Sequence, residues 1–133
     1  MAMRIVITID VPDLEAGVAF YRDALGFEER VRPFPTFVVM TNDRAQIGIM
    51  QKDAGTRPAP GSEDVRSYER HWTPVHADFH VDDFAGTLAR LRAAGATVEE
   101  ELGGGDLPPI AFCADPFGHG FCLIGPRPVG GEG

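Results

Sequence analysis

The stretch that decides the fold reads HADFHVDDF at residues 76–84, and it predicts a strand that leads directly into a helix. Polar and apolar side chains alternate from His76 to Val81, which is the period of a strand with two unlike faces. The polar face carries His76, Asp78 and His80. The apolar face is free to pack against a following helix, so the two imidazoles and the carboxylate turn toward something else.

A helix is predicted next, because Asp82 or Asp83 can accept hydrogen bonds from the backbone N–H groups of its first turn. Phe84, Leu88 and Leu91 recur at i, i+4 and i+7 and form one apolar stripe. Gly95 favours the left-handed conformation that ends a helix.

The same plan occurs earlier in the chain. A strand is predicted over residues 4–10, followed by a helix that is capped by Asp13 and ended by Gly26. Asp13 and Asp83 lie 83 − 13 = 70 residues apart. This spacing indicates an internal repeat.

Each half continues with predicted strands. Residues 27–32 form one strand that Pro33 and Pro35 should break, and a hairpin over 37–41 and 45–50 turns at residues 42–44. In that register, one face of the hairpin carries the side chains of Val38, Met40, Gln46 and Met50, together with Gly48.

The second half is predicted to have a strand over 96–102 with solvated glutamates at 99–101, and then a flexible link of three glycines. A hairpin over 110–114 and 120–124 turns through Asp115-Pro116-Phe117-Gly118, a favourable β-turn sequence. Its pairing puts Phe112 and Cys122 on one face and Cys113 on the other, which argues against a disulfide. Residues 126–133 are predicted to form a loose tail.

The composition narrows the possible classes of protein. A chain of 133 residues, 44% hydrophobic, suits one domain, and two cysteines suit a reducing, cytoplasmic location. The formal charge of −8 argues against nucleic-acid binding and favours cationic small molecules. No targeting or membrane-spanning pattern is present, so no membrane partner is expected.

Three segments resemble the vicinal oxygen chelate superfamily, which includes glyoxalases, bleomycin-resistance proteins and extradiol dioxygenases. They are FYRDALGF at 20–27, the strand and helix over 81–96, and DPFGH at 115–119. The resemblance implies an α+β fold in which two βαβββ modules form one curved mixed sheet with a central cup. It implies a single domain over 1–133, with module one at about 3–51, a linker at 52–74 and module two at about 75–125. It also implies a homodimer.

The superfamily's usual metal-ligand positions fall on Val6, Gly48, His76 and Cys122 of this chain. Valine and glycine offer no donor, and we expect them to widen the cup instead. A lone imidazole does not hold a catalytic divalent ion, and Cys122 suits only a soft metal. We therefore predict no metal, no cofactor and no catalytic residue.

Several interpretations of the polar strand face stay open at this point. In the first interpretation, residues 76, 78 and 80 are hydrogen-bonded groups at the rim of a cup or at a dimer contact. In the second they line a pocket and hydrogen-bond to a ligand, and in the third they form an unorthodox metal or acid–base site. Trp72 is either a packing anchor for the linker or an aromatic lid over a ligand.

The favoured hypothesis is metal-independent sequestration of a cationic or aromatic small molecule, similar to antibiotic-resistance proteins of the bleomycin type. The alternative is a glyoxalase-like lyase, isomerase or dioxygenase with a non-standard site around His76. The predicted ligand-binding residues are Val38, Met40, Gly48, Met50, Trp72, His76, Asp78, His80, Phe112 and Cys122.

Overall fold

The structure, a computed structural model, describes residues 1–128 and divides the chain into two compact units, Met1–Tyr68 and Glu69–Gly133. Each unit contains one βαβββ module, so the predicted repeat and the α+β fold class are confirmed. The strands form two four-stranded mixed sheets, one in each module, rather than the one sheet that was expected. The predicted tail lies mostly outside the described residues. Within the described chain, neither helix is long and apolar enough to cross a membrane.

The helices begin as the sequence predicts. Helix α1 (Leu14–Leu25) is capped by Asp13, which accepts from the Ala16 N–H at 3.0 Å. Helix α2 (Phe84–Ala93) is capped by Asp83, which accepts from the Gly86 N–H at the same distance of 3.0 Å. Each cap satisfies an otherwise unpaired N–H of the first turn.

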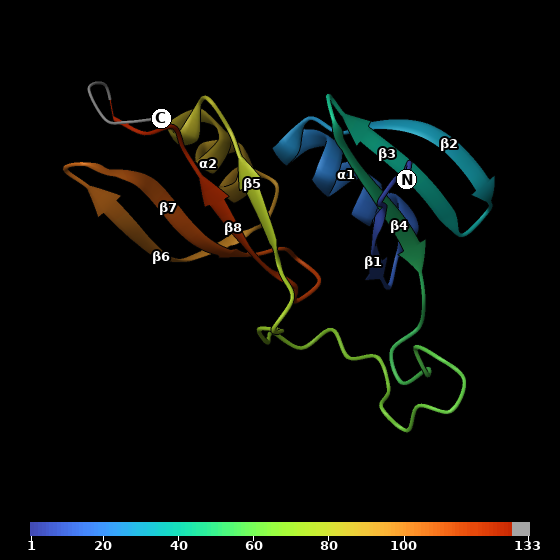
Figure 1. Ribbon diagram of the computed structural model, residues 1–133. Coiled ribbons are helices and arrows are strands. Elements are labelled where there is room, and N and C mark those ends of the chain that lie inside the picture. The colour runs from blue at the N-terminus through green and yellow to red at the C-terminus, as the bar shows by residue number, and fades with distance from the viewer. Residues whose placement is uncertain (129–133) are drawn as a thin grey trace. The chain divides into compact units, whose positions relative to one another are not determined.

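The first sheet has the order β1-β4-β3-β2 (Figure 1), with β1 at Ile7–Val11, β2 at Glu28–Phe34, β3 at Phe37–Asn42 and β4 at Ala45–Gln51. Strand β1 pairs in parallel with β4, and the other pairs are antiparallel. Strand β1 begins three residues later than predicted. Pro33 does not break β2, because β2 is an edge strand with an irregular register and needs no N–H at that position.

The predicted register of the first hairpin is wrong by one residue. Asn42 pairs with Ala45, so the turn is the two residues Asp43 and Arg44, with Asp43 at a positive φ of 51°. Because side chains alternate along a strand, this shift places each residue of β3 on the opposite face relative to β4 from the one predicted.

Val38 and Met40 therefore lie on the face that packs against α1, and both are fully buried. Val38 is paired with Ile49. A Cβ on Gly17 of α1 would come within 2.9 Å of the Ile49 side chain, which locates the helix on this face. The prediction that Val38 and Met40 share a face with Gly48 and Met50 is wrong.

The second sheet has the order β5-β8-β7-β6 (Figure 1), with β5 at Ala77–His80, β6 at Thr97–Gly104, β7 at Leu107–Ala114 and β8 at Gly120–Ile124. Strand β5 runs parallel to β8. The predicted glycine link is largely strand, since Gly104 pairs with Leu107.

The second hairpin has the predicted register and turn. Phe112 pairs with Cys122, and Cys113 pairs with Phe121. The Asp115 carboxylate accepts from the N–H groups of Phe117 and His119 at 2.8 and 3.0 Å. Both cysteines are free thiols, as expected for side chains on opposite faces.

The connection between the modules belongs partly to each unit. Arg66 forms an ion pair with Asp10 at 2.7 Å, and the Tyr68 hydroxyl donates to the Lys52 carbonyl at 2.6 Å. Further along, Arg70 forms an ion pair with Glu99, and the backbone of His71 forms an isolated β-bridge with the backbone of His119. The segment from 69 onward is therefore part of the second unit.

The register of the first hairpin can be checked with two methionines. Met40→Ala should lower the free energy of unfolding by about 2–5 kcal/mol, because it empties a fully buried position. Met50→Ala, at a half-buried position on the other face, should cost clearly less. Urea unfolding of both variants measures this difference, and an equal or larger loss in Met50→Ala would contradict the observed register.

Candidate functional site

The second sheet has one face against α2 and one opposite it, which we call the polar face. The Phe79 and Phe121 rings pack at 5.5 Å on the helix side. Because neighbours along a strand alternate, Asp78 and Cys122 point to the polar face. Asp78, Cys122 and Phe112 occupy paired positions on three adjacent strands and so form a row across the sheet.

Three polar side chains converge on this row. His76 Nε2 lies 3.3 Å from Asp78 Oδ1. One ligand atom from each of His76, Asp78 and Cys122 lies within 4.8 Å of the other two, and in the described chain this is the one such group of three or more. Cys122 is 5% exposed, whereas the other two side chains are partly open to solvent.

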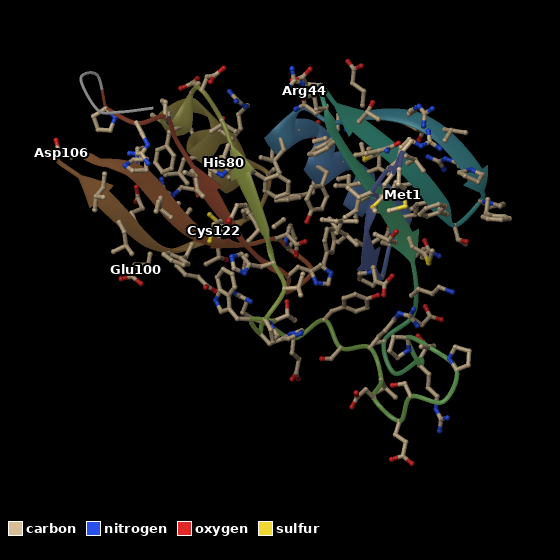
Figure 2. All side chains as sticks on the ribbon, viewed as in Figure 1. Met1, Arg44, His80, Glu100, Asp106 and Cys122 are labelled. Carbon is tan, nitrogen blue, oxygen red and sulfur yellow. The ribbon has the colours of Figure 1, made fainter. Side chains whose placement is uncertain are left out.

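His80 is not part of this cluster. It lies at the far end of β5, paired with Ile124, and its side chain is exposed. Figure 2 shows His80 and Cys122 on the adjacent strands β5 and β8. Of the three polar residues expected in a row on one strand, only His76 and Asp78 lie together. The third member of the cluster is the Cys122 thiol from the neighbouring strand.

Trp72 lies beside the cluster. Its ring packs edge-on against His76 at 5.8 Å and Phe112 at 6.0 Å. It also covers Gly120, where an added Cβ would come within 2.6 Å of the ring. Trp72 is 41% exposed, so it packs on the polar face and still presents part of its ring to solvent.

An ion pair that the sequence did not predict holds Trp72 in place. The Arg70 guanidinium binds both carboxylate oxygens of Glu99, at 2.5 and 2.9 Å, and lies 4.6 Å from the Trp72 ring centroid. The Trp72 indole N–H donates to Glu99 at 3.0 Å. Glu99 is therefore not the solvated residue that its position in a glutamate run predicts.

These bonds change the acidity of Glu99. The hydrogen bond from Arg70 is the largest cause that lowers the pKa of Glu99 below its ordinary value of 4.5. Burial opposes it, and the hydrogen bond from Trp72 lowers the pKa further. The ionised carboxylate is thus the form that anchors the tryptophan.

Both thiols are less acidic than an ordinary cysteine. Burial raises the pKa of Cys113 to about 11. Burial also raises the pKa of Cys122, and the adjacent Asp78 carboxylate adds to the effect. Cys122 without a bound cation is consequently a neutral thiol and a poor nucleophile at neutral pH.

The predicted site residues of the first unit are placed differently. Val38 and Met40 lie under α1, as described above. Gly48 shares a face with Met50, but it does not leave open space. A Cβ on Gly48 would come within 2.7 Å of the Phe37 ring and 2.9 Å of the Thr8 hydroxyl oxygen, so the phenyl ring occupies the space that we expected to widen a cup.

The chain belongs to the glyoxalase-like domain family, whose model matches residues 6–124. Its structural neighbours belong to the glyoxalase/bleomycin resistance/dioxygenase superfamily, also called the vicinal oxygen chelate superfamily. No protein among those with curated functions matches the chain.

Solved structures share the fold. The fosfomycin resistance protein FosX from Listeria monocytogenes is 20% identical, with a TM-score of 0.71 over 96% of this chain and 95% of its own. Lactoylglutathione lyase from Agrobacterium tumefaciens is 18% identical, with a TM-score of 0.64 over 99% of both chains. A glyoxalase/bleomycin resistance/dioxygenase family enzyme from Burkholderia phytofirmans is 19% identical, with a TM-score of 0.65 over 90% of this chain and 95% of its own.

The residues present do not supply the superfamily's usual set of four metal ligands. Two of its four ligand positions hold Val6 and Gly48, which have no donor atom, and Gly48 is closed over by Phe37. The remaining pair, His76 and Cys122, is a nitrogen and sulfur set rather than the oxygen-rich set that hard cations prefer.

The anchor of Trp72 predicts a pH dependence that its fluorescence can follow, because it is the one tryptophan of the chain. A carboxylate whose pKa is lowered in the folded state stabilises its contacts above its ordinary pKa and loses them as the pH falls through the lowered value. The emission spectrum should therefore hold constant down to about pH 4.5 and shift below it.

The neighbouring glutamates supply a matched pair of variants for this test. Glu99→Gln should already show the acid spectrum at pH 7, whereas Glu100→Gln should behave as the parent protein. An acid shift of equal size in Glu99→Gln and the parent would mean that another group controls the tryptophan.

Proposed function

We propose that the protein binds and sequesters a small organic molecule on the polar face of the second sheet, without the superfamily's catalytic metal ion. One observation carries the proposal: partly exposed aromatic side chains and a few polar groups gather on one sheet face. Trp72 and Phe112 supply the aromatic surface, and His76 and Asp78 supply hydrogen-bonding groups beside it. Apolar lining with a small number of placed polar groups is typical of small-molecule sites.

The charge supports a cationic, aromatic ligand. The chain carries a formal charge of −8, and Asp78 places a partly exposed carboxylate next to the aromatic surface. A negative protein attracts cations, and an aromatic cation can also use the ring faces.

Sequestration fits the chemistry better than turnover. The Cys122 thiol has a raised pKa, which does not favour a nucleophile. The structural neighbours of the chain include a protein named as a fosfomycin resistance protein, FosX, and we extend the role of resistance to this chain as part of the proposal.

Calorimetry with metal-free bleomycin as a cationic, aromatic probe tests this function in the presence of EDTA. Phe112→Ala should weaken binding about tenfold or more, because it removes the aromatic centre of the site. Fosfomycin, a small phosphonate, should bind more weakly than bleomycin to the same acidic chain.

Phe34→Ala is the matched control, since it removes an exposed phenyl ring from edge strand β2 of the first sheet. It should leave the affinity unchanged. Equal affinities of the parent, Phe112→Ala and Phe34→Ala for bleomycin would refute this location, and tighter binding of fosfomycin would refute the ligand class.

A further inference from the structure

The cluster on the polar face combines three kinds of donor that metal ions use. It presents an imidazole nitrogen from His76, a carboxylate oxygen from Asp78 and a sulfur from Cys122, all within 4.8 Å of one another. Ligand atoms around one tetrahedral ion lie about 3.5 Å apart. The His76–Asp78 distance of 3.3 Å already meets this value. The Cys122 sulfur lies within 4.8 Å of both ligand atoms.

The backbone holds two of the three donors in register. Asp78 and Cys122 are paired residues of the parallel strands β5 and β8, so their Cα atoms are fixed side by side although they lie 44 residues apart (122 − 78). His76 is packed by the edge of Trp72, whose own indole N–H is bound by Glu99. This packing restricts the orientation of the His76 ring.

A comparison of corresponding positions in the two modules shows that only the second module carries these donors. With the 70-residue spacing of the two caps, position 76 corresponds to Val6 and position 78 to Thr8. In the first sheet, Thr8 pairs with Gly48, as Asp78 pairs with Cys122 in the second. The first module therefore has no nitrogen, carboxylate or sulfur donor in this row, and the second has three.

We propose that His76, Asp78 and Cys122 bind one thiophilic divalent cation of the Zn²⁺ class within the second module alone. The ligand set differs from the superfamily's metal centre in using a thiolate and a second β5 residue and in needing nothing from the first module. Three protein ligands leave one coordination position for water or a small molecule. On binding, the thiol proton is released and the sulfur–metal bond forms, with no change of oxidation state.

Cobalt(II) is the probe, because it replaces zinc in such sites and a thiolate–cobalt bond absorbs in the near ultraviolet. Titration of tag-free, EDTA-treated full-length protein with Co²⁺ should give this absorption band and saturate at one ion per chain. Zn²⁺ added afterwards should remove the band. His76→Ala and Asp78→Asn should each weaken cobalt binding by about tenfold or more.

The two cysteines form a matched pair of variants. Cys122→Ala should abolish the band, whereas Cys113→Ala, which removes the thiol on the helix face, should keep it. Thermal unfolding of both variants verifies that they are folded. If Cys113→Ala does not fold, Cys113→Ser serves as the second comparison, because it also removes the thiol from the helix face and nearly keeps the size of the side chain.

No band in the parent protein would overturn the proposal, as would a band that survives in Cys122→Ala. Saturation at one ion per two chains would also overturn it, because the ligands would then come from two molecules. The proposal does not rest on the proposed function: the probe is the metal alone, whereas the bleomycin experiment is performed in EDTA.

Discussion

Both modules depend on the parallel pairing of their first and last strands. Parallel neighbours cannot be joined by a tight turn, so each module needs the crossover that its helix provides. In the second module this pairing joins β5 to β8 and brings Asp78 beside Cys122. Without this pairing, His76 and Asp78 would have no thiol beside them and no sheet to fix their positions.

Much of the fold could be predicted because local signals agreed with one another. The capping aspartates gave the helix starts and the repeat, and Asp115-Pro116-Phe117-Gly118 defined the second hairpin through its turn chemistry. The turn at 42–44 lacks such a signature. A two-residue turn and a three-residue turn were equally compatible with it, and the choice between them moved Val38 and Met40 to the wrong face.

The site was less predictable than the fold. Alternation along the strand placed His76 and Asp78 together, because their spacing is local. The Arg70–Glu99 pair spans 29 residues and joins a loop to a strand, and no pattern in the sequence distinguishes Glu99 from the two glutamates after it. The bulge in β6 that breaks the alternation between Val98 and Glu100 also depends on the partner strand.

The close packing around Gly48 has an evolutionary consequence. Phe37 and Thr8 leave no room for even a methyl group at this position, so a donor side chain there requires Phe37 to move or become smaller first. The two changes are therefore coupled rather than additive. A descendant of this chain could not acquire a metal ligand at position 48 by one substitution without disturbing its first sheet, and the order of steps on such a path is set by packing, not by metal chemistry.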